Sequence, residues 1–212
     1  MIGQHVKPGV TTDELDRLCH DHIVQVQKAV PANLNYRGFP KTICTSVNHV
    51  VCHGIPGDKR LKDGDIINID VTLWKDGVHG DTSATFLVGE VDDLSLTLVR
   101  ETARSLDLGI AAVTPGGLVS DIGKAIESHA VKHRLGVVRE FIGHGVGTEF
   151  HSNLQIPHYH ERRLATRLEL DTSFTIEPML TRGSERLILM KDGYTLKTSD
   201  NSRSAHFEHT VL

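Results

Sequence analysis

The sequence predicts an α+β domain in which helices cover an antiparallel sheet. Residues 11–29 carry apolar side chains at helical spacing, and residues 94–112 and 118–134 also favour helices. Seven segments alternate or are rich in strand-forming side chains: 41–47, 65–74, 83–88, 137–142, 172–180, 185–190 and 204–212. Because the predicted helices interleave with hairpin-like pairs of strands, an α+β fold is expected.

The first predicted helix has a defined start. Thr11 and Glu14 have the spacing of a capping box, in which each side chain accepts a hydrogen bond from the other residue's backbone. The apolar face that follows consists of Leu15, Leu18, Cys19, Ile23 and Val26. The second and third helices contain Gly109 and Gly123, which lower their helix propensity.

The composition is that of an ordinary globular protein. Of the 212 residues, 39% are hydrophobic and 24% charged, and the formal net charge of −4 gives no broad attraction to nucleic acid or to an anionic membrane. No apolar stretch approaches the length of a membrane span, and the first residues lack signal-peptide character. The three cysteines form no CxxC pair, so we expect no disulfide framework and a reducing, cytoplasmic location.

A weak internal repeat runs through the chain. Pro8-Gly9 and Pro115-Gly116 each open a predicted helix, and they lie 107 residues apart. Residues 61–70 match residues 168–177 at the same offset of 107. Two matches at one offset indicate a duplicated unit; the alternative is coincidence between common helix-start and strand patterns. A duplication would bring Asp70 and Glu177 to related positions.

Acidic side chains lie on the polar faces of three predicted strands. Asp70, Glu177 and Glu208 each lie opposite the apolar side chains of their segment. Taken singly, each pattern indicates an amphipathic strand with a solvated polar face. Asp81 follows a glycine and, taken singly, indicates a turn residue.

Taken together with His144, these acids form a mixed oxygen and imidazole ligand set. Such a set suits manganese, iron, cobalt or zinc. Converging carboxylates would repel one another without cations, and a pair of divalent ions removes that conflict. Two ions about 3.5–4 Å apart could share a hydroxide and polarise a carbonyl. The residues alone make this a hypothesis.

Six motifs in order carry a resemblance to a known family. They are VCHGIP at 51–56, GDIINIDV at 64–71, HGDTSATF at 79–86, GHGVGTEFH at 143–151, FTIEPM at 174–179 and SAHFEHTVL at 204–212. Together they closely resemble the type I methionine aminopeptidases of bacterial kind, metallopeptidases with the pita-bread fold. The resemblance covers nearly all 212 residues. It implies one catalytic domain, 1–212, with pseudo-symmetric halves of about 1–92 and 93–212.

The resemblance also implies the metal ligands. They are Asp70, Asp81, His144, Glu177 and Glu208. Asp70 would serve one of two divalent ions (Co, Mn, Fe(II) or Zn), His144 and Glu177 would serve the other, and Asp81 and Glu208 would bridge them. Glu177 would accept the proton of the attacking water.

Substrate contacts follow from the same resemblance. His151 would bind the oxygen of the scissile carbonyl, and His53 would contact the amide nitrogen side. The methionine side chain would occupy a cup formed by Tyr36, Phe39, Cys44, His53, Phe150 and Tyr194, although core packing is the alternative for each aromatic side chain. The implied partners of this monomeric cytoplasmic enzyme are nascent protein N-termini or methionyl peptides, and the ribosome.

Two other functions stay open. A proline-specific aminopeptidase or prolidase of the same fold would share the five ligands, whereas a non-catalytic binding protein of this fold would typically have lost some. His129 and His133 lie four residues apart on a predicted helix, but no HExxH pattern accompanies them, so we interpret them as a helix face.

The sequence departs from the family at its ends and at single positions. The family usually has a further helix before VKPG and more strand after EHTVL, so a chain truncated at both ends is expected. Leu170-Asp171-Thr172 stands where the family favours Pro-Gly-Met, which we expect to affect the local turn and not the ligands. Tyr194 stands where tryptophan is common, and Asn33 where a small apolar residue or cysteine is common.

Overall fold

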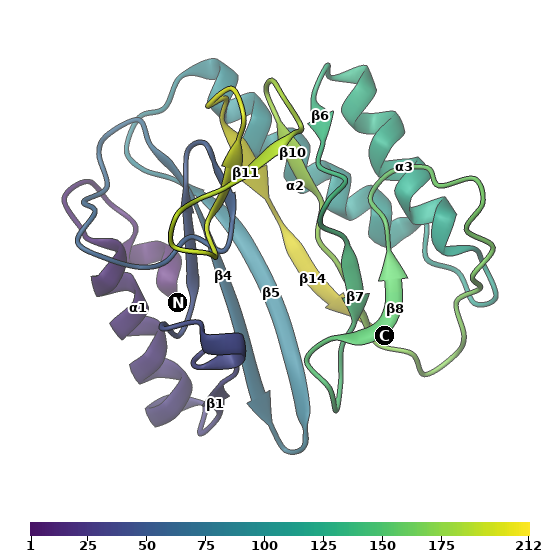
Figure 1. Cartoon of the computed structure of the whole chain (residues 1–212), viewed down its shortest axis with the longest axis horizontal. Coiled ribbons are helices and arrows are strands. Elements are labelled where there is room, and N and C mark those ends of the chain that lie inside the picture. The colour runs from purple at the N-terminus through teal and green to yellow at the C-terminus, as the bar shows by residue number, and fades with distance from the viewer.

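The computed structural model describes residues 1–212 (Figure 1). Its helical elements are η1 (Ile2–His5), α1 (Thr12–Asp21), η2 (His22–Val26), η3 (Tyr36–Gly38), α2 (Asp93–Ala111) and α3 (Val119–Lys132). Its strands are β1 (Val30–Pro31), β2 (Cys44–Val47), β3 (Val50–Cys52), β4 (Ile66–Lys75), β5 (Val78–Leu87), β6 (Gly136–Val137), β7 (Gly143–Gly145), β8 (Ser152–Ile156), β9 (Phe174–Ile176), β10 (Met179–Thr181), β11 (Leu187–Leu189), β12 (Leu196–Thr198), β13 (Ser204–His206) and β14 (Glu208–Val211).

The strands form three antiparallel sheets, which confirms the predicted α+β class. The largest has eight strands in the order β1-β4-β5-β14-β9-β7-β8, with β2 also paired to β4. The smaller sheets have the orders β13-β10-β6 and β11-β12-β3. In Figure 1 the long β4 and β5 run side by side through the centre, with α1 on one flank and α2 and α3 behind the strands. No helix is long and apolar enough to cross a membrane.

The three predicted helices are present, and their signals have physical explanations. The capping box of α1 is formed, because the side chain of Thr11 accepts from the backbone of Glu14 and the side chain of Glu14 accepts from the backbone of Thr11. The first helix is shorter than expected, since the α-helix ends at Asp21 and a π-turn, η2, follows. A Cβ on Gly123 would lie 2.2 Å from the carbonyl oxygen of Tyr159, so this glycine lets α3 pack closely against the 157–159 segment.

Strand alternation separates an apolar face from a polar face, as predicted. On the helix side, Ile67 and Ile69 of β4 pack with Leu15 of α1, and Phe174 and Ile176 of β9 pack with α2 and α3. The polar faces point the other way. The interpretation of those faces as solvated is wrong, because Glu177 and Glu208 are buried, as is the Oδ1 atom of Asp70.

Three strand predictions are wrong where the chain changes sheets. The segment 172–180 is interrupted after Ile176, because β9 belongs to the eight-stranded sheet and β10 to another. The segment 204–212 is interrupted at Phe207 in the same way. The segment 137–142 leaves one sheet after Val137, and the next strand, β7, starts only at Gly143. Other predicted strands have different bounds in the structure. The predicted segment 83–88 corresponds to the second half of β5, so Asp81 lies within a strand and not in a turn. Strands β1, β3, β7, β8 and β12 were not predicted.

The repeat appears as two equivalent backbone contacts. Thr11 forms an isolated antiparallel bridge with Arg60, and Leu118 forms one with Arg167. In each pair both residues are 107 positions from their counterparts in the other pair, and each arginine also donates to a glycine carbonyl, Arg60 to Gly9 and Arg167 to Gly116. The recurrence supports the proposed halves, 1–92 and 93–212, of a single domain.

Asp171 stands where the family favours the glycine of Pro-Gly-Met, and it adopts a φ of 60°. This is the left-handed region that glycine and, less often, aspartate adopt.

Candidate metal and substrate site

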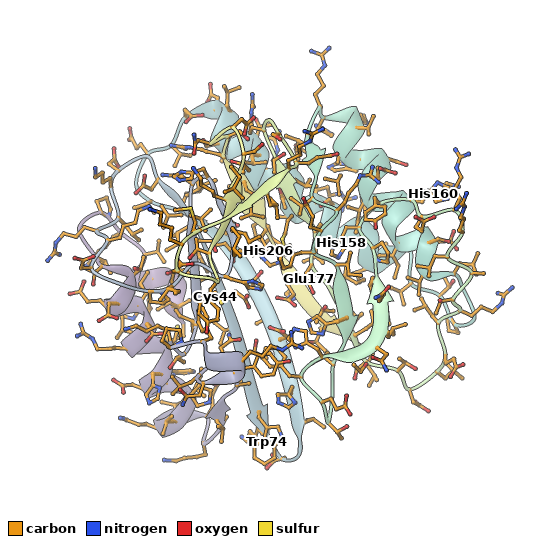
Figure 2. All side chains as sticks on the ribbon, in the orientation of Figure 1. Cys44, Trp74, His158, His160, Glu177 and His206 are labelled. Atoms are coloured by element: carbon orange, nitrogen blue, oxygen red, sulfur yellow. The ribbon has the colours of Figure 1, made fainter.

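A cavity of about 610 Å³ lies between the polar face of the eight-stranded sheet and the small β11-β12-β3 sheet. All twelve residues named above for metal or substrate binding line it: Tyr36, Phe39, Cys44, His53, Asp70, Asp81, His144, Phe150, His151, Glu177, Tyr194 and Glu208. Figure 2 places Cys44, Glu177 and His206 together near the centre of the molecule. Residues up to 172 positions apart in the sequence therefore meet in one cavity.

The strand register brings the acids together. Thr72 of β4 pairs with Asp81 of β5, so both side chains point to the same face. β14 lies between β5 and β9, with Glu208 opposite Ser83. Glu177 follows β9 directly. The carboxylates thus come from neighbouring positions across the sheet.

His144 lies among these carboxylates. Its Nε2 is 3.7 Å from Oδ2 of Asp81 and 3.6 Å from Oε1 of Glu177. Single ligand atoms of Asp81, His144 and Glu208 all lie within 4.8 Å of one another. The Nδ1 of His144 is 3.1 Å from the carbonyl oxygen of Gly145. That contact assigns the ring proton to Nδ1 and leaves the Nε2 lone pair directed at the acids, the arrangement of a metal-binding histidine.

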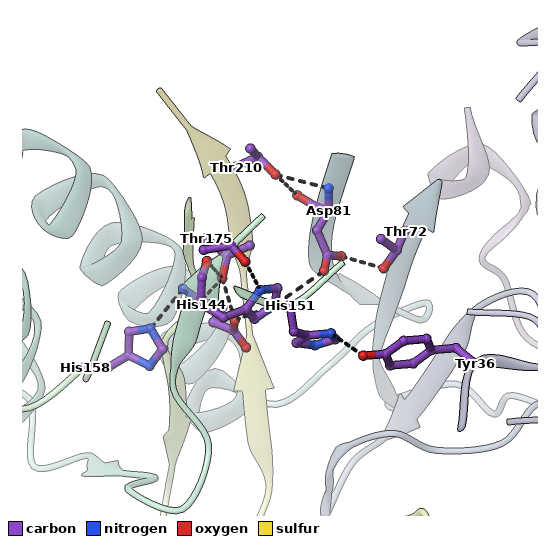
Figure 3. A network of polar contacts seen from close by, with 10 residues as sticks. Tyr36, Thr72, Asp81, His144, His151, His158, Thr175 and Thr210 are labelled. Atoms are coloured by element: carbon purple, nitrogen blue, oxygen red, sulfur yellow. Dashed lines mark hydrogen bonds and ion pairs between the residues drawn. The ribbon is translucent and has the colours of Figure 1, made fainter. Parts of the chain in front are cut away.

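Threonine hydroxyls hold two of the carboxylates in place. Thr72 donates to Oδ1 of Asp81 and Thr175 donates to Oε1 of Glu177, both at 2.7 Å (Figure 3). The Thr210 hydroxyl also binds the backbone of Asp81. These bonds fix the orientation of the carboxylates without neutralising their charge.

The site is electrostatically unfavourable unless cations enter it. Burial and the neighbouring acids raise the pKa of Asp70, Glu177 and Glu208 well above their ordinary values, and burial raises the pKa of Asp81 to about 7. The Oδ1 atom of Asp70 is buried with no hydrogen-bond partner. An orphaned carboxylate oxygen beside other buried acids and a neutral imidazole is the donor chemistry that divalent ions require. The residues therefore fit a metal.

Two more histidines lie in the cavity. His53 has a φ of 54°, a left-handed conformation that is strained for this residue type, and burial lowers its pKa. The hydroxyl of Tyr36 lies 3.0 Å from Nδ1 of His151 (Figure 3). If the hydroxyl donates, the ring proton of His151 lies on Nε2. The centres of the His151 and His144 rings are 4.0 Å apart, which places His151 beside the acids.

Aromatic side chains enclose the rest of the cavity. Tyr36 and Phe150 have ring centres 4.6 Å apart, and Phe39 meets Tyr194 edge to face at 5.5 Å. The Tyr194 hydroxyl donates to the carbonyl oxygen of Arg37. The tyrosine that stands in place of tryptophan is thus anchored to the opposite wall. The cavity combines an apolar part with an acidic part.

Sequence reasoning missed His158 and His206. His158 is fully buried and its Nε2 accepts from the backbone N–H of Glu177 at 3.0 Å. His206 is buried, lines the cavity, and has no hydrogen-bond partner at either ring nitrogen. His206 lies two positions before Glu208 in the sequence, and His158 contacts Glu177 in space. Their roles depend on contacts that periodicity does not reveal.

Comparison with known proteins places these features in a family context. The sequence model of metallopeptidase family M24 matches residues 1–212. The methionine aminopeptidase of Salmonella typhimurium is 52% identical over 213 residues, which cover 100% of this chain and 81% of that protein. That of Escherichia coli K12 is 51% identical over the same share of both chains.

Solved structures agree. The crystal structure of methionine aminopeptidase from Rickettsia prowazekii superposes with a TM-score of 0.96 at 50% identity and covers 99% of this chain and 84% of that one. The prolidase of Pyrococcus furiosus has a TM-score of 0.72 at 19% identity and covers 100% of this chain and 55% of that one. At that identity the likeness shows the shared fold alone.

Proposed function

The chain belongs to metallopeptidase family M24, and from this membership and from its relatives we infer that it is a methionine aminopeptidase, a metal-dependent hydrolase that removes an N-terminal methionine. The fold is accordingly the pita-bread fold of that family. The observation that carries the inference is the gathering of all twelve residues predicted for metal or substrate binding around one cavity. Identity of about half over the whole chain favours this function over that of the prolidases, which share the fold.

We propose that the acidic part of the cavity holds two divalent ions. Asp81 and Glu208 would bridge them, with Asp70 on one ion and His144 and Glu177 on the other. The unpartnered Oδ1 of Asp70 and the lone pair of His144 support this assignment. When bound, such ions polarise a carbonyl and lower the pKa of a water molecule. Manganese, iron, cobalt and zinc all suit the ligands.

Glu177 is proposed to move the proton. Thr175 donates to Oε1 of Glu177 and holds it in a fixed position. The carboxylate can therefore accept a proton from the attacking water and return it to the nitrogen that leaves. The three steps of attack, transfer and departure then share one general base.

His151 and His53 are proposed to hold the scissile bond. A neutral His151 that receives a hydrogen bond from Tyr36 on Nδ1 presents its Nε2–H to the carbonyl oxygen, where negative charge develops. His53 would contact the amide nitrogen side. The proposed methionine cup of Tyr36, Phe39, Cys44, His53, Phe150 and Tyr194 lies in the same cavity. The substrate amine would face the acids, which restricts cleavage to the first peptide bond.

The proposed substrates are nascent protein N-termini or methionyl peptides, and the proposed location of the reaction is the cytoplasm. The three free cysteines suit such a reducing compartment. Ribosome contact and a monomeric state stay predictions.

The test is a matrix of metals and substrates on metal-stripped protein. Chelation should abolish cleavage of Met-Ala peptides, and manganese, cobalt or iron(II) should restore it. Met-Leu and X-Pro peptides should be poorer substrates than Met-Ala peptides. Full activity with no detectable residual metal would contradict the metal assignment, and preferential cleavage of X-Pro peptides would establish the prolidase alternative instead.

A further inference from the structure

A second cluster of metal-binding side chains lies on the pair of helices behind the sheet. Glu101 comes from the middle of α2, His129 from the last turn of α3, and His133 is the C-cap residue that follows α3. The Nε2 atoms of His129 and His133 lie 3.0 and 3.5 Å from the same carboxylate oxygen, Oε2 of Glu101. None of the three residues lines the cavity described above.

The geometry of the two helices assembles this cluster. His129 and His133 are four residues apart, so their side chains project from one face of α3, and their ring centres are 4.5 Å apart. α2 packs against α3 closely because a Cβ on Gly109 would lie only 2.9 Å from Ile126. The carboxylate of Glu101 is consequently held between the helices, with its side chain 9% exposed, against 29% for His133.

The remaining oxygen of Glu101 has its own partner. Nε of Arg100 donates to Oε1 at 2.8 Å, which leaves Oε2 for the histidines. Arg100 therefore acts like the outer partner that commonly orients a ligating carboxylate.

The donor set matches a zinc-type ion. Ligand atoms around tetrahedral zinc are about 3.3–3.6 Å apart, given bonds of about 2.0–2.2 Å. The 3.5 Å contact of His133 with Oε2 has that spacing, and the 3.0 Å contact of His129 is shorter. One ligand atom from each of the three residues lies within 4.8 Å of the others. Partly exposed His133 leaves room for water as a fourth ligand.

A hydrogen-bonded pair explains the cluster less completely. His129 makes a normal hydrogen bond to Glu101, but the contact of His133 is at the 3.5 Å limit for one. A cation bound to all three side chains would account for both imidazoles pointing at one oxygen. Hydrogen bonding accounts well only for the shorter contact. We propose that Glu101, His129 and His133 bind zinc or a similar borderline divalent ion, at a site separate from the cavity, and that the ion links α2 to α3.

The proposal does not depend on the activity, so its test counts ions. Metal-stripped protein and its His133→Gln variant would be titrated with Zn²⁺ alone, and bound zinc measured after removal of free metal. His160→Gln, a partly exposed histidine outside the cluster, is the matched control. The wild type and the control should bind one zinc equivalent more than His133→Gln, or bind it at least about tenfold more tightly. Cleavage of Met-Ala peptides should be the same in all three.

A crystal of the wild-type chain soaked in Zn²⁺ provides the second measurement, which does not depend on any variant. Anomalous scattering at the zinc edge should show a peak bonded to Glu101, His129 and His133. Equal zinc binding by wild type and His133→Gln, or no peak at the cluster while zinc occupies the cavity, would overturn the proposal. A zinc peak at the cluster with none in the cavity would support this proposal and would count against the proposed active centre.

Discussion

The backbone N–H of Glu177 donates a hydrogen bond to Nε2 of His158, 3.0 Å away (Figure 3). Because Nε2 accepts, the ring proton is on Nδ1, which is buried without a partner. Burial lowers the pKa of His158 to about 3, so the ring stays neutral at physiological pH. His158 is therefore a positioning residue: it holds the backbone at the point where Glu177 enters the cavity.

Replacing His158 should disturb Glu177 without removing it. His158→Ala leaves a buried N–H unpaired and a cavity behind, which should lower the free energy of unfolding by about 2–4 kcal/mol. Turnover should fall more than substrate affinity, because the change displaces Glu177, the proposed base, and leaves the proposed methionine cup in place. His158→Gln, whose side-chain oxygen can accept the same bond, should recover part of both losses. Urea unfolding measures the free energy of unfolding, and steady-state kinetics measure turnover and KM, with His160→Ala as the control. Equal behaviour of the two alanine variants would exclude the positioning role.

The proposed metals should be inequivalent, because only one of them has an imidazole ligand. The position equivalent to His144 in the first half is Arg37, 107 residues earlier. His144→Ala should then weaken one ion selectively and reduce turnover sharply, while Glu177→Gln should also remove the base. Metal titration by calorimetry distinguishes one weakened site from two. Two unchanged sites in His144→Ala would mean that this histidine merely packs beside the sheet.

The apolar part of the cavity should select methionine. In the proposed cup a methionine side chain would be buried among Tyr36, Phe39 and Tyr194, whereas alanine would leave most of that space empty. The difference in binding free energy should be roughly 2–5 kcal/mol. Met-Ala-Ser should therefore exceed Ala-Ala-Ser in kcat/KM by well over tenfold. Phe39→Ala should narrow that ratio by lowering the Met value. A ratio near one in the unmodified chain would show that the cup is misassigned.

The metal-free chain should lose stability through Asp81 as pH rises. The pKa of Asp81 is about 7 in the folded chain and about 3.9 when unfolded. The unfolded state therefore releases this proton first, and the contribution of Asp81 to the free energy of unfolding falls between about pH 4 and pH 7. Asp81→Asn keeps the acceptor for Thr72 and removes the charge, so its advantage over wild type should grow across that range.

Urea unfolding of both metal-stripped chains at pH 5, 6, 7 and 8 measures this difference. Asp58→Asn, at an exposed carboxylate, is the control and should show no such trend. With manganese present the order should reverse, because the wild-type carboxylate then has a cation. A pH-independent difference without metal would contradict the burial of an ionisable Asp81.

Strand alternation placed acids on the polar faces of the strands, but the five proposed metal ligands came from the family resemblance, and several fold predictions needed the third dimension. Alternation along β4 assigned Asp70 to the face opposite Ile69, and the structure agrees. The same alternation did not reveal that the polar face is buried, because the sheet that covers it includes β3, β11 and β12, and neither β3 nor β12 was predicted. Nor can periodicity show that the chain changes sheets at Phe207, since the alternation continues through it.

His158 and Glu101 were missed for a related reason. His158 acquires its role from a contact with Glu177, 19 positions away, and Glu101 from contacts with His129 and His133, 28 and 32 positions away. No spacing pattern encodes such contacts. The histidine pair on α3 was recognised as a helix face, but the partner on α2 that changes its meaning could be found only in the structure.

The position of β14 has a consequence for synthesis. This strand fills the seam between β5 and β9, and the hydroxyl of Thr82 in β5 donates to Glu208, 126 residues further along the chain. While the ribosome translates the intervening segment, β5 and β9 lack the strand that joins them, and both present unpaired edges. The sheet can close only after residues 208–211 leave the exit tunnel, so the proposed binding of one ion by Asp81 and Glu208 together can occur only after that point. Nascent chains that stall before this strand should bind chaperones rather than metal.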